Sequence, residues 1–319
     1  MAVPGEFQHS AAPIHPAAGH PGEEDCITWF IASERRPTQD PAEAWEIPFT
    51  EDEGGSYFRN NRPSHPRTPR LAEDIPLDAL ESLRDICGIE GLNQVFIIPL
   101  AVRTTGWHGQ KVISPNSVLA IGNRAVGLWT EKPHPGVKIA IPLEKLAAIE
   151  DVTILLYGRL SFLSLGDRLT IRYNTVAREG MEPALLELRK RLAGPAQEVP
   201  PDEIEAAGLP YKWSYVLGTT LVRLEENTPV VSRFASVRRR LRRAAERGQL
   251  LALNPFELVY VFDPVESMER YGEDSFTVPR ARMTGVRIQD EELEVSSNGV
   301  RFLLSMAPPL REAAIRWCG

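Results

Sequence analysis

Short apolar runs separated by turn-forming residues dominate the chain from residue 95 onward. Val118–Ile121 and Ala125–Trp129 flank the dipeptide Gly122-Asn123, and Leu160–Leu165 is followed closely by Arg168–Tyr173. Turn residues between short, partly alternating runs are typical of antiparallel hairpins. The pattern therefore predicts a protein that consists mainly of antiparallel β-sheets.

Two stretches show helical spacing instead. A helix is predicted over 76–87, opened by Pro76 and ended by Gly88, and a second one over 184–192, opened by Pro183. Further strand-like runs lie between the predicted helices. The runs are Val95–Val102, with Pro99 indicating an edge or bulge, Val137–Ile141 and Val152–Tyr157.

One pattern occurs twice. The residue types of Leu160–Ile171 recur without gaps in Leu293–Leu304, at an offset of 133 residues. Ile141-Pro142 has a counterpart in Val278-Pro279, and each copy ends in an apolar helical stripe. Matching blocks in the same order predict a duplicated unit. We expect an N-terminal arm (1–70), a first unit with its preceding helix (71–194), a linker (195–210) and a second unit (211–319).

A strand-rich unit of this length with one amphipathic C-terminal helix resembles the pleckstrin-homology (PH) fold, particularly its bacterial versions. The resemblance covers roughly 95–193 and 212–318. It implies an α+β, mainly β architecture in which a bent antiparallel sheet of seven strands is closed at one end by the helix. A β-sandwich with helical decoration is the alternative.

Lipid-binding members of that family carry basic residues on the first two strands and the loop between them. The matching region holds only Arg103 and Lys111 in the first unit, and Arg223 followed by Glu225 and Glu226 in the second. This departure disfavours headgroup binding there. The resemblance then implies binding of peptides or proteins along a sheet edge or beside the helix.

The first 70 residues differ from the rest. They hold ten of the 27 prolines and 11 acidic against 6 basic residues. Such a composition is typical of a partly disordered arm. Two segments rich in aromatic and β-branched residues, Cys26–Ile31 and Ala44–Phe49, are either free or docked as short extended segments.

Candidate chemistry is sparse. We find no nucleotide-binding, serine-nucleophile or zinc-protease motif, so no catalytic residue, metal or cofactor is predicted, and a non-catalytic role is favoured over an enzymatic one. Cys26, Cys87 and Cys318 form no Cys-x-x-Cys pair. Free thiols, no apolar run long enough to span a membrane and no signal-like start favour a cytoplasmic location.

The net charge of -7 hides a basic segment. Residues 231–247 carry seven arginines with apolar residues at helical spacing, which predicts an amphipathic helix with a guanidinium face. We take as candidate ligand-binding residues Arg233, Arg238, Arg239, Arg240, Arg242 and Arg243. Their partner is an acidic protein, a nucleic acid, an anionic membrane surface, or the chain's own acidic region 290–294.

A second candidate lies at a predicted hairpin tip. Trp107 and His108 stand between Gly106 and Gly109. Functional loops often present such residues, although a loop tryptophan also folds back on the core. Taken together, these features predict a non-catalytic binding or scaffold protein that recognises a protein or peptide partner through tandem PH-like units. The alternatives are nucleic-acid or anionic-lipid binding through 231–247, and an enzyme with its site between the units.

Overall fold

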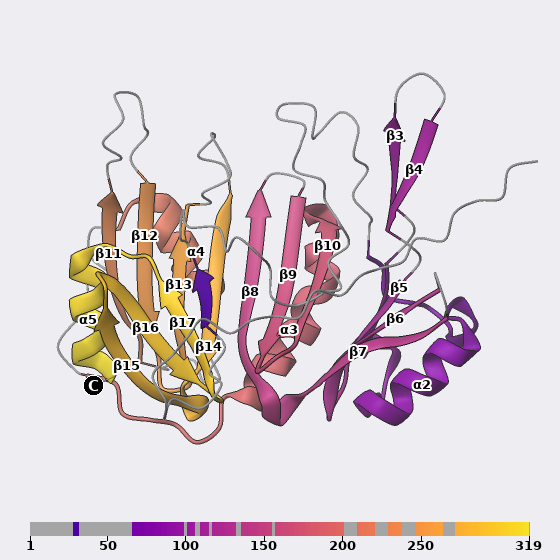
Figure 1. The fold of residues 1–319 in the computed structure, drawn as a ribbon, viewed down its shortest axis with the longest axis horizontal. Coiled ribbons are helices and arrows are strands. Elements are labelled where there is room, and N and C mark those ends of the chain that lie inside the picture. The colour runs from indigo at the N-terminus through magenta and orange to yellow at the C-terminus, as the bar shows by residue number, and fades with distance from the viewer. Residues whose placement is uncertain are drawn as a thin grey trace, which may run out of the picture.

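The computed structural model of the chain describes residues 28–31, 66–98, 101–105, 109–114, 117–131, 135–154, 157–200, 209–220, 229–237, 247–263 and 272–318. The described part is mainly β, with antiparallel sheets and a few helices (Figure 1). No helix in the described residues is long and apolar enough to cross a membrane.

A seven-stranded antiparallel sheet, which we call the shared sheet, runs through the middle of the molecule (Figure 1). In spatial order its strands are β10 (Arg168–Asn174), β9 (Tyr157–Ser164), β8 (Leu146–Ile154), β14 (Glu273–Pro279), β13 (Glu257–Phe262), β12 (Arg247–Leu253) and β11 (Val231–Val237). Strands β8 and β14 are neighbours in the sheet although they lie far apart in the sequence. Glu150 on β8 pairs with Phe276 on β14.

Smaller sheets flank the shared sheet. The N-terminal sheet has the order β2 (Val95–Ile98), β5 (Ser117–Ile121), β6 (Ala125–Thr130) and β7 (Gly136–Pro142). The C-terminal sheet has the order β1 (Thr28–Ile31), β17 (Val300–Leu304), β16 (Glu292–Ser297) and β15 (Met283–Gln289). A separate hairpin consists of β3 (Ala101–Thr105) and β4 (Gly109–Ser114).

In the described part of the chain, four α-helices pack around these sheets. They are α2 (Leu77–Cys87), α3 (Arg178–Leu192), α4 (Tyr211–Thr220) and α5 (Pro308–Cys318). The short 3-10 helices are η1 (Ala72–Asp74), η2 (Leu92–Gln94), η3 (Leu143–Lys145), η4 (Thr175–Ala177) and η5 (Arg280–Arg282). Helix α2 ends at Gly88, whose φ of 71° is the left-handed conformation that favours glycine at the end of a helix.

The same order of elements occurs twice. We call the elements from β2 to α3 the first unit and those from β11 to α5 the second unit. Setting aside the β3–β4 hairpin and η4, the described residues of each unit form four strands, a 3-10 turn after a proline, three strands and a helix. Even an irregularity recurs, because the register shifts between Leu146 and Ala148 on β8 and between Met283 and Gly285 on β15.

Each unit has its own apolar core. Large buried residues of the first core include Phe96, Phe162 and Tyr173, while those of the second include Tyr260 and Phe302. Helices α2 and α4 cover the opposite faces of β5–β6 and β12–β13 and form two further clusters. The sheets are therefore covered on both faces over much of their area, which explains strands such as β6 and β13 that are buried at every position.

The prediction of an amphipathic helix over 231–247 is wrong at both ends of that range. Residues 231–237 form strand β11 and Arg247 begins strand β12, while 238–246 lie outside the described residues. The misleading spacing has a physical cause. Val231 packs in the second core, whereas Phe234 packs from the opposite face against Trp213 of α4, with ring centroids 5.4 Å apart. A strand covered on both faces thus mimics helical periodicity.

Other boundaries differ in detail. The strand expected at 152–157 is the end of β8 and the start of β9, and β8 begins earlier, at Leu146. Pro183 lies inside α3 instead of opening it. Helix α4 was not predicted. In the N-terminal arm, Thr28–Ile31 is docked as strand β1, whereas Ala44–Phe49 lies outside the described residues.

Candidate binding site on the β8–β10 face and the β17 edge

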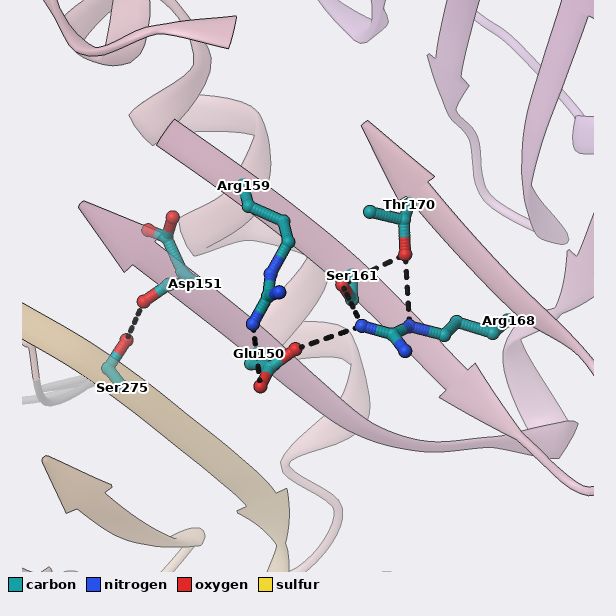
Figure 2. Close-up of polar contacts among 7 residues, drawn as sticks. All are labelled: Glu150, Asp151, Arg159, Ser161, Arg168, Thr170 and Ser275. Carbon is teal, nitrogen blue, oxygen red and sulfur yellow. Dashed lines mark hydrogen bonds and ion pairs between the residues drawn. The ribbon is translucent and has the colours of Figure 1, made fainter. Parts of the chain in front are cut away.

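A row of polar side chains crosses one face of β8, β9 and β10. Glu150, Ser161 and Thr170 are direct cross-strand partners, and Arg159 and Arg168 stand two residues away from the row on the same face (Figure 2). Their sequence neighbours point to the opposite face, into the core of the first unit, because side chains alternate along a strand. We call these five residues the β8–β10 cluster.

Glu150 is the centre of the β8–β10 cluster. Its carboxylate lies 3.4 Å from a guanidinium nitrogen of Arg159 and 3.5 Å from one of Arg168 (Figure 2). The Nε of Arg168 donates a hydrogen bond of 3.1 Å to the hydroxyl of Thr170, which is 3.0 Å from the hydroxyl of Ser161. Two guanidinium groups are thus held on one carboxylate, and hydroxyl groups fix the orientation of Arg168.

The two arginines control the protonation of Glu150. Burial by itself would raise the pKa of Glu150, but Arg159 and Arg168, with a hydrogen bond from Ser161, outweigh burial and lower that pKa below its ordinary value. Glu150 is therefore ionised at neutral pH. Both arginine side chains keep part of their surface exposed, 17% for Arg159 and 14% for Arg168.

A related cluster lies on the outward face of the C-terminal sheet. Arg287 on β15 contacts Glu294 on β16 through two nitrogens, at 2.9 and 3.0 Å, and Ser296 donates to the same carboxylate at 3.4 Å. Arg301 on β17 is the cross-strand partner of Ser296. These four residues help to line an open groove of about 410 Å³. We call them the β15–β17 cluster.

The two clusters occupy equivalent places in the two units. Counted from the shared bulge, Glu150 and Arg287 are at the same strand position, and the repeat matches Arg168 with Arg301. The acidic residue lies on a different strand in each unit: Glu150 is on the first strand after the 3-10 turn, and Glu294 is on the second. Each cluster nevertheless combines one buried glutamate with two arginines and a serine.

The edge of β17 holds an additional strand. Strand β1 pairs with β17 in parallel, with Thr28 opposite Arg301 and Ile31 opposite Leu304. It comes from the N-terminal arm, outside both units, and joins the sheet at the side of the β15–β17 cluster (Figure 1). The second unit therefore binds an extended segment by strand addition, with the main-chain hydrogen bonds of a sheet.

The pairing of β8 with β14 is reinforced by a buried polar network. Arg178 of α3 lies 3.1 Å from Asp151 on β8 and 3.3 Å from Glu273 on β14. Tyr173 donates to Asp151 at 2.9 Å, and the hydroxyl of Ser275 donates to the Asp151 carbonyl at 3.2 Å (Figure 2). Burial raises the pKa of Asp151 against the opposing effects of Arg178 and the Tyr173 hydroxyl. We call this the joint network, because it fixes one unit to the other.

The residues singled out from the sequence lie elsewhere. Arg233 is half-buried on β11, which is at the opposite end of the shared sheet from β10. Trp107 and His108 belong to the connection between β3 and β4, outside the described residues. The remaining candidate arginines also lie outside them: Arg238, Arg239, Arg240, Arg242 and Arg243.

Sequence reasoning missed both clusters. Their charged residues are single positions on strands, separated by turns, so no local motif brings them together. The available signal was the polar side of the alternation, as in Arg159-Leu160-Ser161 and Arg168-Leu169-Thr170. That signal is ordinarily read as a solvated face.

Among the described residues no group of acidic, histidine or cysteine side chains could hold a metal ion. Cys87 and Cys318 are free thiols. No family model matches the sequence, and no curated protein is significantly similar to it.

Proposed function

We propose that this is a non-catalytic binding protein whose tandem PH-like units recognise an extended, acidic segment of a partner protein. Four strands, three strands and a C-terminal helix in each unit support the PH-like reading. The proposed site is the edge of β17 together with the β15–β17 cluster. The β8–β10 cluster occupies the equivalent position in the first unit.

The observation that carries this proposal is the pairing of β1 with β17. A four-residue segment from a proline-rich arm occupies a sheet edge of a unit that begins some 200 residues later in the chain. Main-chain pairing does not depend on residue type, so an edge that accepts β1 can accept another extended segment. Side chains on the neighbouring sheet face then select among such segments.

The clusters indicate which segments are selected. Arg301 pairs directly with Thr28, and the sequence immediately before β1 contains Glu23, Glu24 and Asp25. Arginine binds carboxylates through two parallel hydrogen bonds, as Arg287 does with Glu294. An extended segment flanked by carboxylates therefore suits the site, and the arm provides the chain's own version of that ligand.

The test uses the full-length chain and a displayed library of random peptides. In a Trp29→Pro/Phe30→Pro variant, proline removes backbone donors at adjacent positions, so strand β1 can no longer pair through either set of alternating N–H groups. We expect this variant to select acidic, β-branched or aromatic peptides, and a synthetic peptide of residues 22–34 to compete with them. The unmodified chain should bind the same peptides more weakly, because β1 already occupies the edge.

Arg301→Glu in the same background should abolish the selection, whereas Arg316→Glu, on α5 outside the clusters, serves as the matched charge control. Peptides that are not displaced by the 22–34 peptide would contradict binding at β17. Salt-sensitive binding of nucleic acid or anionic vesicles that is lost when Arg238, Arg240 and Arg243 become glutamate would instead support the alternative site.

A further inference from the structure

The pairing of β8 with β14 joins two strands that have different places in their units. Strand β8 is the first strand after the 3-10 turn of the first unit, and β14 is the last strand before the 3-10 turn of the second unit. Their antiparallel register runs from Ile149 opposite Thr277 to Thr153 opposite Glu273. One unit thus offers the strand after its turn, and the other offers the strand before its turn.

The counterparts of these two strands are β15 and β7. Strand β15 follows η5 in the second unit as β8 follows η3 in the first, and the two strands share the bulge described above. Strand β7 precedes η3 as β14 precedes η5, and both end in a proline, Pro142 and Pro279. Each chain therefore contains one completed junction and both halves of a second one.

Both counterparts are edge strands. Among the strands that the structure describes, β15 has a neighbour only in β16, and β7 only in β6. Their exposure agrees with this position. Thr284, Gly285, Arg287 and Ile288 are exposed on β15, and six of the seven residues of β7 are partly exposed, whereas every residue of the adjacent β6 is buried.

We infer that β15 of one copy pairs with β7 of a second copy, and that the chain associates head to tail by repeating its internal junction. The occupant of the edge is thus another molecule of this protein. Such a contact is heterologous, so it closes into a ring or extends as a fibre depending on the rotation between copies. The inference does not depend on the proposed peptide-binding function, since it uses different edges.

The internal junction predicts the register of the new one. Ser275 faces Asp151 within the chain, so the equivalent pair between copies, counted back from the prolines that end β14 and β7, is Lys138 opposite Ile288. Lys138 is also the bulged residue in the pairing of β7 with β6, where Ile139 faces Leu128 and Val137 faces Trp129. Ile288 is 51% exposed in the single chain, and the aliphatic part of a lysine side chain would cover it. Asp290, at the adjacent turn, lies diagonal to Lys138 in this register.

The first experiment measures the mass of the full-length chain in solution over a range of micromolar concentrations by sedimentation. We expect reversible association above the 35.6 kDa monomer. Ile288→Lys should weaken association roughly tenfold, because it places two like charges opposite each other and removes an apolar contact. Adding Lys138→Glu to that variant should restore association. Leu186→Lys, at a residue that is 40% exposed on α3, is the matched control and should leave association unchanged.

The second experiment tests the register without disturbing the charges. Mixing a Lys138→Cys variant with an Ile288→Cys variant should give a disulfide between copies, identified by mass spectrometry, since directly opposed Cα atoms are about 5 Å apart. A Thr284→Cys partner, four residues away along β15, should not form that disulfide. A strictly monomeric wild-type chain, association unaffected by Ile288→Lys, or equal cross-linking through Thr284→Cys would each overturn the inference.

Discussion

Arg178 carries much of the joint network, and replacing it provides a quantitative test of how the units are held together. The Arg178→Met change keeps the aliphatic volume but removes the guanidinium that contacts Asp151 at 3.1 Å and Glu273 at 3.3 Å. Breaking a buried ion pair by deleting one partner typically costs about 3–5 kcal/mol. Because 27% of the Arg178 side chain is exposed, we expect the lower end, about 3 kcal/mol.

The loss of stability caused by Arg178→Met should increase as the pH rises. Burial raises the pKa of Asp151 above its ordinary 3.8, and Arg178 opposes this rise. Without Arg178 that pKa rises further. An acidic group whose pKa is higher in the folded state than in the unfolded state makes its full contribution to the free energy of unfolding at pH values below the unfolded-state pKa. That contribution is lost as the pH rises through the folded-state pKa. The Arg178→Met variant should therefore be close to wild type near pH 3.8 and clearly weaker at neutral pH.

Urea unfolding followed by tryptophan fluorescence, at several pH values, measures this effect. At neutral pH the midpoint should fall by roughly 1 M urea. Adding Asp151→Asn removes the buried charge that was left unpaired, so the double variant should regain much of the loss. A loss of equal size at every pH, or a double variant no more stable than Arg178→Met, would refute the assigned role of the joint network.

Two further predictions concern close packing and thiol chemistry. Gly158→Ala should destabilise the protein by about 1–3 kcal/mol in the same urea assay, because a Cβ at this position would lie 2.4 Å from the ring of Tyr173. Gly180→Ala on α3, where a Cβ meets nothing within 4 Å, is the control and should stabilise by up to about 1 kcal/mol. Burial raises the pKa of Cys87 to about 12 and that of Cys318 to about 11, so both thiols should react with iodoacetamide far more slowly in the native protein than in urea at neutral pH. Peptide mapping by mass spectrometry would contradict this if Cys87 were modified at the same rate in both states.

The sequence predicts the elements whose apolar pattern is local. The helix at 76–87 is confirmed as α2, Leu77–Cys87, because its stripe has a single buried face and Gly88 ends it. The strands around Gly122-Asn123 are confirmed for another reason: although both are buried at every position, one local turn sets their register. The expectation of a mainly antiparallel β protein agrees with the sheets observed.

Two elements of the second unit were predicted less well. Helix α4 was missed and β11 was taken for a helix, and these two elements pack against each other through Trp213 and Phe234. When both faces of a strand are buried, the period of two disappears from its sequence. The β8–β10 cluster was also out of reach, since its members become neighbours only after the strands have paired.

The shared sheet has a consequence for how the protein is made. Strand β8 pairs with β14 from Ile149 to Thr153, so this edge stays open while the ribosome adds residues 154–277. At a synthesis rate of roughly 5–20 residues per second, the interval is on the order of 10 s. During that time one edge of β8, a partly apolar strand, is unpaired and is exposed to every other nascent chain nearby. Polysomes are therefore where incorrect pairing between chains is most favoured, and a chaperone that covers β8 until β14 emerges would raise the yield of correctly folded protein.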